Sequence, residues 1–497
     1  MKKRTLVVLL CLVLVCSFAA CDIQFGGLLG ELFETDEILY HPPLEDVIPE
    51  PGSMDSWLEN EGEIGTNGSY VELPAYMYAG YQVVVLGDLA YDLGSTDSQD
   101  NIVERLTYAR NQTVQEKYGI LIDSKYVMWS DITNEVKNAV QSGSTDYDIV
   151  LAPISVTGST LAMQDLLMNL NELPYLDLGG AAWDTGINEG LAIGAYLPMA
   201  TGQIVPSSDL GTSLLVFSTK MAEDYGVDMY DYVLCGGWTL AKMHAIVNEF
   251  YLDLNGDAMP NAGDQFGLAI DNDHVYAFAC GADAMWIDKD DQNLPVLNTV
   301  TDLERIVSAY EQFYQMMQEY SVRYNNADGN SQESAFAIFE QENAFIYATT
   351  YEEMLFDLSG ADMKYGVLPY PKLDEEQRSY QSFVSTAANA VMVPASARDV
   401  DLVGYTLEAL AQASDQMYFA SLSTRACRSA QDVEMLSLVL DSKTLDFGSN
   451  YLLNVAGSPV QHFKNALMQN NTSITTFIKM YEKTISKELQ NILDVSH

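Results

Sequence analysis

An α/β fold is predicted by the order of apolar segments that begins at residue 81. Residues 81–87 (YQVVVLG) form an unbroken apolar run, which is typical of a strand buried on both faces. Residues 98–118 have the pattern of a helix, and residues 131–141 repeat it with apolar side chains on one face. Further strands are expected at 120–128 and 147–151. Strands that alternate with helices predict a parallel sheet with helical crossovers.

The alternation continues along the chain and ends in helices. The clearest helix covers residues 301–320, where apolar side chains recur at helical spacing. Short apolar runs predict four more strands, at 211–218, 266–270, 344–348 and 365–368. The remainder is mostly helical in pattern, including 399–413 and 473–493, so a helical C-terminus is expected.

The size and charge of the chain limit its functions. With 497 residues it is too long for one ordinary hydrophobic core, so two or three domains are expected. It has 70 acidic and 24 basic residues, and its formal net charge is -46. A charge of that sign repels nucleic acids and anionic lipid surfaces, so no nucleic-acid partner is expected.

Residues 1–20 have the features of a signal peptide. Lys2, Lys3 and Arg4 supply positive charge, an apolar run follows at 5–16, and small residues precede the expected cleavage site. Cys21 then stands in a context that resembles the lipobox of bacterial lipoproteins, whose cysteine becomes the lipid-modified first residue. Plain secretion is the alternative. No other stretch is apolar for long enough to span a membrane, so attachment is expected through the lipid anchor only.

The segment that follows has the composition of a linker. Residues 21–79 are rich in Glu, Asp, Pro and Gly and show little periodicity, which is typical of an acidic, flexible tether. Beyond it the cysteines are Cys235, Cys280 and Cys427, which are widely spaced and form no CxxC pattern. We expect them to be buried free thiols rather than a disulfide framework or a metal site.

The most specific chemical signal is an oxygen-rich loop of twelve residues, 253–264. EF-hand calcium loops take ligands from positions 1, 3, 5, 7, 9 and 12, and position 7 binds through its backbone carbonyl. At these positions the loop has Asp253, Asn255, Asp257, Met259, Asn261 and Asp264. Ala258 replaces the usual glycine of position 6, and the final Asp resembles dockerin-type loops. A structural Ca²⁺ is expected here, and an Asx-rich turn without metal is the alternative.

The order of the segments resembles that of a known family. The lipobox-like Cys21 is followed by YDIVLAP (147–153), QDLLMNLNELPYLDL (164–178), AWD (182–184), GTSLLVFSTKMAEDYGV (211–227), GGWTLAKM (236–243), the oxygen-rich loop and YGVLPYPK (365–372). This series resembles the extracellular solute-binding proteins of ABC importers, in the broad family that includes maltose- and oligosaccharide-binding lipoproteins. Ser218-Thr219-Lys220 departs from the asparagine–lysine pair that the family usually has there.

The resemblance implies two α/β lobes joined by a hinge, with a ligand cleft between them that closes around the solute. Lobe 1 would comprise residues 80–210 and 373–425. Lobe 2 would comprise residues 211–372 and 426–497.

Aromatic side chains are the expected ligand contacts, because sugars stack on flat rings. The expected ligand-binding residues are Trp129, Trp183, Trp286, Tyr380, Ser382 and Phe383. Trp129 follows the second predicted strand at its carboxyl end, where open α/β sheets bind ligands. Packing in the core is the alternative for each of these side chains.

The resemblance implies a lipid-anchored, monomeric protein on the extracellular face of a bacterial membrane. It would capture a small polar solute, in first place an oligosaccharide, and deliver it to the transmembrane subunits of an ABC permease. A peptide or another small organic solute is the alternative ligand. A secreted carbohydrate-active hydrolase is the alternative of another class. The sequence has no GxSxG, HExxH, P-loop or GxGxxG motif in a suitable context, so no catalytic residues are expected.

Overall fold

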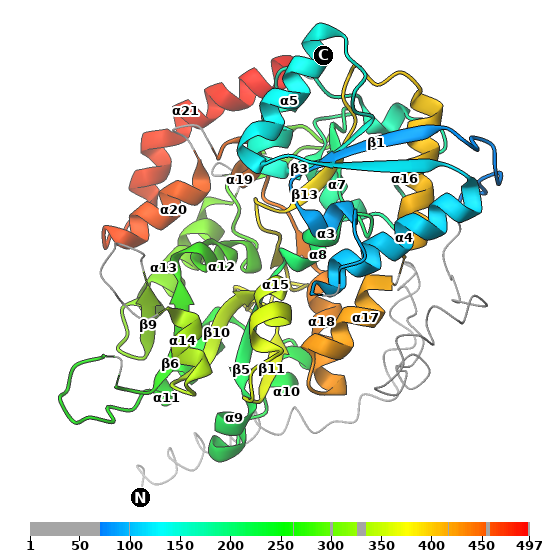
Figure 1. Ribbon diagram of the computed structural model, residues 1–497. Coiled ribbons are helices and arrows are strands. Elements are labelled where there is room, and N and C mark those ends of the chain that lie inside the picture. The colour runs from blue at the N-terminus through cyan, green and yellow to red at the C-terminus, as the bar shows by residue number, and fades with distance from the viewer. Residues whose placement is uncertain are drawn as a thin grey trace, which may run out of the picture. The chain divides into compact units, whose positions relative to one another are not determined.

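The computed structural model describes residues 70–98, 100–261, 263–298, 302–325, 334–415, 417–453 and 458–495 (Figure 1). The expected signal peptide, Cys21 and the tether up to residue 69 lie outside these ranges. Within the described ranges, no helix combines the length and the apolar character needed to cross a membrane.

A first five-stranded sheet follows the predicted alternation. Its strands are β1 (Gln82–Gly87), β2 (Leu121–Tyr126), β3 (Ile149–Pro153), β4 (Met199–Ala200) and β13 (Asn389–Met392), in the order β2-β1-β3-β13-β4. β1 pairs in parallel with β2 and β3, whereas β13 is antiparallel to β3 and β4. The three parallel strands predicted between residues 81 and 151 are therefore confirmed.

A second five-stranded sheet is built from the middle of the chain. Its strands are β5 (Ser213–Ser218), β6 (Phe266–Asp271), β9 (Val322–Asn325), β10 (Ala344–Thr350) and β11 (Tyr365–Leu368), in the order β11-β5-β10-β6-β9. β6, β9 and β10 run parallel to one another, and β5 is antiparallel to β10 and β11. The described residues also form two small strand pairs: the hairpin of β7 (Ile287–Lys289) with β8 (Pro295–Leu297), and the parallel pair of β12 (Ser382–Phe383) with β14 (Lys443–Thr444).

Helices cover both sheets and make up most of the described chain after β13. Before β13 they are α3 (Ala90–Leu93), α4 (Ile102–Tyr118), α5 (Trp129–Ser142), α6 (Ser159–Ala162), α7 (Thr185–Leu191), α8 (Pro206–Leu210), α9 (Thr219–Tyr225), α10 (Met229–Leu234), α11 (Leu240–Glu249), α12 (Val275–Gly281), α13 (Leu303–Met317), α14 (Ala335–Glu340) and α15 (Tyr351–Glu353). After it they are α16 (Val400–Ser414), α17 (Met417–Ala426), α18 (Ala430–Asp441), α19 (Phe447–Tyr451), α20 (Pro459–Met468) and α21 (Ile474–Val495). Figure 1 shows α4 and α16 beside the first sheet and α9, α10 and α11 beside the second.

Local capping explains where the predicted helices begin and end. α4 begins at Ile102 rather than near residue 98, because Asn101 Oδ1 accepts the backbone N–H groups of Val103 at 2.9 Å and Glu104 at 3.2 Å. α5 ends before Gly143, whose φ of 68° is left-handed and stops the helix.

The end of the predicted tether is part of the folded body. The Tyr405 hydroxyl in α16 donates to the Pro74 carbonyl at 2.5 Å, and Gln412 Nε2 donates to the Val71 carbonyl at 3.0 Å. Tyr78 packs edge-on against Tyr405, with ring centroids 5.2 Å apart. Residues 70–79 are therefore docked on α16, so the structured body begins earlier than the tether prediction implies.

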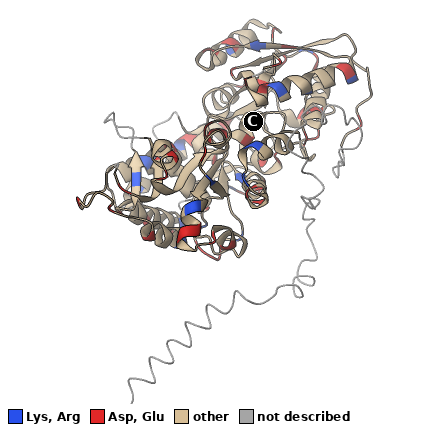
Figure 2. Cartoon of the chain, turned by 60° about the horizontal axis from the view of Figure 1, so that its bottom comes forward, with Lys and Arg blue, Asp and Glu red and all other residues tan. Residues whose placement is uncertain are grey.

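The charged side chains are mixed over the described part of the chain. Figure 2 shows Lys and Arg segments scattered among Asp and Glu segments rather than gathered on one face. The buried core is apolar and includes side chains from both sheets, such as Val83, Leu151, Val216 and Ile346.

Candidate functional site

Parallel strands end at a common edge in each sheet. β1, β2 and β3 share one such edge in the first sheet, and β6, β9 and β10 share one in the second. Open α/β sheets bind ligands beyond the carboxyl ends of their strands. The residues that follow these six strands are therefore the first candidates for a site.

Beyond β1, a buried polar network joins three segments. Asn389, at the start of β13, donates through Nδ2 to Asp88 Oδ1 and to Asp92 Oδ2, in both cases at 2.9 Å. Asp92 Oδ2 also accepts the Ser207 hydroxyl of α8 at 2.6 Å. Burial raises the pKa of Asp92 to about 6, although the hydrogen bonds from Ser207 and Asn389 lower it. The network fixes the end of β1 against the segment that leads to the second sheet.

Beyond β10, Glu353 gathers polar side chains at the edge of the second sheet. Its Oε2 accepts the hydroxyls of Thr349 at 2.6 Å and Tyr347 at 3.1 Å. His274, which follows β6, places Nε2 3.7 Å from the same oxygen. Burial lowers the pKa of His274, while nearby carboxylates, Glu353 first, oppose that change.

A side-chain hydrogen bond joins the two edges. The Tyr91 hydroxyl of α3 donates to Glu352 Oε1 of α15 at 3.1 Å. Burial raises the pKa of Glu352, and the hydrogen bond from Tyr91 lowers it. Ionised carboxylates only accept hydrogen bonds, so these edges suit a ligand that carries hydroxyl or amino donors.

Three backbone segments between the sheets lie side by side. Thr212, just before β5, forms an antiparallel bridge with Val384, just after β12. β12 in turn pairs in parallel with β14, Ser382 with Lys443 and Phe383 with Thr444. Short paired segments of this kind can absorb the backbone rotation of a hinge. The three segments together therefore form the candidate hinge.

A buried lysine ties these segments to the first sheet. Lys443 Nζ lies 2.8 Å from both carboxylate oxygens of Asp184 and 2.6 Å from Asp209 Oδ1. The lysine side chain is 8% exposed. Burial lowers its pKa, but the two carboxylates outweigh burial and raise the pKa above its usual value. Lys443 is therefore a charged group held in the interior by two partners.

The comparisons with known proteins concern the fold. No protein-family model matches the sequence, and no curated protein matches it. The GacH receptor of Streptomyces glaucescens, solved unliganded and with acarbose, matches with a TM-score of 0.52 and 14% identity over 81% of this chain and 99% of that one. A cyclo/maltodextrin-binding protein complexed with maltotetraose matches with a TM-score of 0.54 and 11% identity, over 84% of this chain and 96% of that one. UgpB from Mycobacterium tuberculosis, in complex with glycerophosphocholine, matches with a TM-score of 0.54 and 12% identity, over 83% of this chain and 98% of that one.

The fold is that of the solute-binding proteins. The two-lobe α/β architecture and the helical C-terminus predicted from the sequence are confirmed. The boundaries of the two lobes in the sequence stay a prediction.

Within this solute-binding-protein fold, Trp129 is the predicted tryptophan whose ring is accessible. It begins α5 directly beyond β2 and is 58% exposed. Trp183 is 4% exposed, and its indole N–H donates to Glu408 Oε2 at 3.2 Å. Trp286 is 1% exposed and stacks on His462 of α20. The last two indoles lie in the core, where protein atoms cover their faces.

The other three predicted ligand-binding residues, Tyr380, Ser382 and Phe383, lie beside the candidate hinge and are buried. The Tyr380 hydroxyl donates to a backbone carbonyl of α10 at 3.0 Å. Ser382 belongs to β12, and its hydroxyl shares a 3.0 Å hydrogen bond with that of Ser442. Phe383 packs edge-on against Tyr276, with centroids 5.8 Å apart. These contacts hold the hinge together and leave no free polar or aromatic face at the three positions.

Sequence reasoning missed the residues that the structure gathers at the hinge and between the lobes. Lys443 and Asp184 are 259 positions apart, and Tyr91 and Glu352 are 261 apart. No local pattern marks either pair, because a single Lys or Glu in a polar segment is also typical of a solvated surface.

The oxygen-rich loop folds back on itself. Leu252 and Gln265 pair across its base. The Asp253 carboxylate accepts the backbone N–H groups of Gly256 at 2.7 Å and Ala258 at 2.8 Å. Ala258 has a φ of 63°, the left-handed conformation for which position 6 of a calcium loop usually has glycine. Ala258 thus has the backbone conformation that position 6 requires, and the same conformation is compatible with an Asx-rich turn without metal.

Oxygen atoms of the loop converge on Asn261. Its Nδ2 lies 2.8 Å from Asp257 Oδ2 and 2.9 Å from the Met259 carbonyl oxygen, and its Oδ1 accepts Asn255 Nδ2 at 2.9 Å. An N–H donor therefore stands between the oxygens of positions 5 and 7, where a cation would also find acceptors. No three His, Cys, Asp or Glu side chains group as metal ligands among the described residues. A cation here would depend on carboxamide and backbone oxygens as well, which suits Ca²⁺.

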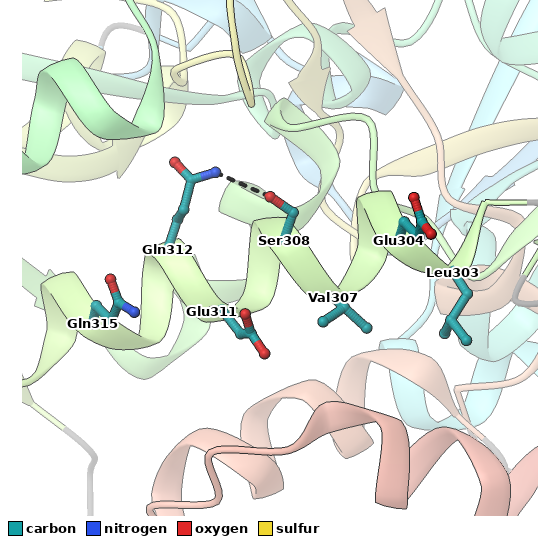
Figure 3. Close-up of a pocket in the computed structure, with 7 residues that line it drawn as sticks. All are labelled: Leu303, Glu304, Val307, Ser308, Glu311, Gln312 and Gln315. Carbon is teal, nitrogen blue, oxygen red and sulfur yellow. Dashed lines mark hydrogen bonds between the residues drawn. The ribbon is translucent and has the colours of Figure 1, made fainter.

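A shallow hollow of about 390 Å³ lies along α13, away from these groups (Figure 3). In Figure 3, Leu303, Val307 and Glu311 point to one side of the helix, and Ser308 and Gln312 point to the other. None of the ligand or metal residues predicted from the sequence lines it. The strand ends and the candidate hinge, rather than this hollow, therefore remain the candidate site.

Proposed function

We propose that the protein is a lipid-anchored extracellular receptor that captures a small polar solute and delivers it to the transmembrane subunits of an ABC importer. The proposed solute class is an oligosaccharide. It binds between the strand ends of the two lobes, which close on it by rotation at the hinge. The function is binding and not catalysis.

The observation that carries this proposal is the hinge between two α/β sheets. Thr212, Val384 and the β12–β14 pair place three connecting segments side by side, and each sheet ends in polar side chains near that hinge. Ligand binding drives closure when the ligand has contacts in the closed arrangement that the open one lacks. Groups such as Asp88 and Glu353, on different lobes, would provide such contacts.

The chemistry of these edges supports a solute rich in hydroxyl groups. The carboxylates accept hydrogen bonds, and the exposed Trp129 ring offers a face on which a pyranose can stack. Acarbose and maltotetraose, which the structurally similar GacH receptor and cyclo/maltodextrin-binding protein hold, are oligosaccharides. The glycerophosphocholine held by UgpB is a polar solute of another kind and belongs in any ligand screen.

The membrane partner enters the proposal through Cys21. Lipid attachment at this cysteine would keep a monomeric receptor at the extracellular face beside its permease. In the original host or a related bacterium, Cys21→Ser should move the protein from the membrane fraction into the medium. Retention of the Cys21→Ser variant in the membrane fraction would contradict the anchor.

A thermal-shift screen of the mature chain tests the proposed function. Oligosaccharides, peptides and glycerophosphodiesters are added one at a time, and a true ligand at one hundred times its Kd should stabilise the protein by roughly 2.7 kcal/mol. The same preparation is incubated with chromogenic glycosides. A rise in melting temperature without turnover supports the receptor, whereas glycoside turnover would establish the hydrolase instead.

We also propose that the loop 253–264 holds a structural Ca²⁺. The ligands would be the side chains of Asp253, Asn255, Asp257, Asn261 and Asp264 and the carbonyl of Met259. When bound, the cation would clamp the turn between α11 and β6 by neutralising its carboxylates. The loop directly precedes β6, whereas the strand-end group His274 follows that strand, so the loop lies at the opposite end of β6 and its role is stability.

A further inference from the structure

The hairpin of β7 and β8 extends from the second lobe to the first. In the sequence the hairpin follows α12 and precedes α13. These two helices pack against each other, and α13 packs against β9 of the second sheet. Trp286 anchors the base of the hairpin in the core of that lobe by stacking on His462. The tip, residues 290–294, meets residues 189–194 at the end of α7, which lead into β4 of the first sheet.

Three hydrogen bonds join this hairpin to the backbone of residues 189–194. The Gly194 N–H donates to the Asn293 carbonyl at 3.0 Å. Asn293 Nδ2 donates to the Glu189 carbonyl at 3.2 Å, and Lys289 Nζ donates to the Ala192 carbonyl. Because the first lobe contributes only backbone atoms, the contact depends on the shape of this segment and on its position.

The tip is built to make this contact. Asp290 Oδ1 accepts the N–H groups of Gln292 at 2.9 Å and Leu294 at 3.0 Å, which closes the turn. Asn293 has a φ of 59°, a left-handed conformation that asparagine tolerates better than most residues. The Leu294 side chain lies 3.2 Å from where a Cβ on Gly194 would stand. A Cβ at Gly194 would therefore crowd the Leu294 side chain, and the φ of 60° at Gly194 would strain any residue other than glycine.

Lys289 is a half-buried lysine, and burial of its charged ammonium group costs free energy. Its ammonium group lies 4.7 Å from the centroid of the Phe447 ring, and burial lowers its pKa to about 8. Phe447 begins α19, which also packs against residues 154–158 beyond β3 of the first lobe. The lysine thus bonds to the first lobe while lying on an aromatic ring at the junction of the two lobes.

We propose that this hairpin is a strap that holds the two lobes in one arrangement beside the hinge, where α7 also packs against β14. Rotation at the hinge would move residues 287–297 relative to residues 189–194 and break the three hydrogen bonds. The lobes of the solute-free protein therefore occupy one narrow arrangement while the strap is docked. The inference depends on the two-lobe fold and not on the identity of any solute.

Distances between spin labels test the strap in the full chain without a solute. Labels attached to a keto amino acid at the exposed positions Asn138 (α5) and Glu223 (α9) report the separation of the lobes and leave the cysteines unchanged. The wild-type protein should give one narrow distance distribution. In the double variant Lys289→Ala with Asn293→Gly, a second label-to-label distance from molecules with an undocked strap should appear. Its population should be roughly tenfold higher than in the wild type, because each lost hydrogen bond shifts the docking equilibrium severalfold.

Lys242→Ala is the matched control, because Lys242 lies at the same 4.7 Å from an aromatic ring, that of Tyr232, within the second lobe. It should keep the wild-type distribution. Asn293→Gly alone is the second variant if the double variant does not fold, since glycine adopts a φ of 59° without strain. A broad wild-type distribution, or folded strap variants that match the wild type, would overturn the proposal.

Discussion

At the scale of single residues, Asp446 gives the protein a pH-dependent stability. It is buried and caps α19, where its carboxylate accepts the N–H groups of Gly448 at 3.1 Å and Ser449 at 3.0 Å and the Tyr276 hydroxyl at 2.7 Å. Burial raises its pKa from 3.8 to about 6, although these hydrogen bonds lower it. A carboxyl group with a raised folded-state pKa stabilises the fold below pH 3.8, and this contribution is lost as the pH rises through about 6.

Replacing this residue should flatten the pH profile. The wild-type free energy of unfolding should fall between about pH 4 and about pH 7 by roughly 3 kcal/mol more than that of Asp446→Asn, since two pKa units correspond to that energy. Urea denaturation at both pH values measures the difference. Asp100→Asn, at an exposed position, is the control. Parallel profiles for wild type and Asp446→Asn would contradict the assignment.

The tryptophans should separate binding from stability. Trp129→Ala removes an exposed ring, so it should weaken the Kd for the solute found in the screen about tenfold while changing stability by less than about 0.5 kcal/mol. Trp286→Ala empties a core position and should lower the free energy of unfolding by about 3–5 kcal/mol. Titration calorimetry and urea denaturation measure the two effects. Unchanged solute binding in Trp129→Ala would remove this residue from the site.

At the scale of elements, the sequence predicted strands whose burial is continuous. β1, β3 and β5 were found because both of their faces are buried, which leaves an apolar run in the sequence. β9 has four half-buried residues and gives no such run. β12 and β14 have two residues each and exist because distant segments meet at the hinge. Local pattern carries no information about that meeting.

The candidate site was harder to predict for the same reason. An indole has the same apolar character in a ligand cleft as in a core, and Trp183 is fixed in the core by Glu408, 225 positions away. Trp129 follows the carboxyl end of β2 and its ring is exposed, and its role in binding stays a prediction. The loop 253–264 was recognisable because all of its polar groups lie within twelve consecutive residues.

That loop supports a prediction about metal dependence. In calcium, the wild-type melting temperature should rise by an amount equivalent to roughly 2.7 kcal/mol at one hundred times the Kd, and a chelator should abolish the rise. Asp253→Asn with Asp257→Asn should melt at the same temperature with and without calcium. Asp374→Asn is a matched control, because Asp374 also accepts two backbone N–H groups, of Glu376 and Gln377, but lies outside the loop. If the double variant lost the same stability with and without chelator, the calcium site would be contradicted.

At the scale of the whole molecule, Lys443 connects parts of the chain that a hinge must hold together. Asp184 occupies the N-cap position of α7 without a capping hydrogen bond from its side chain, Asp209 lies in α8 before β5, and Lys443 begins β14. Their side chains are 16%, 17% and 8% exposed, so water screens them little. The group has two negative charges for one positive charge, and burial raises the pKa of Asp209 while Lys443 lowers it.

Lys443→Met should lower the free energy of unfolding by about 3–5 kcal/mol near pH 7, because it leaves two buried carboxylates without a cation. Without Lys443 the pKa of Asp209 should rise further, so protonation should recover part of the loss near pH 5. Adding Asp184→Asn and Asp209→Asn should restore most of the stability, since a neutral buried cluster needs no counter-charge. Urea denaturation of the wild type, the single variant and the triple variant at both pH values measures these effects.

A single variant as stable as the wild type would show that the ion cluster does not hold the hinge. A triple variant no more stable than the single one would show that shape, and not charge, is what Lys443 contributes.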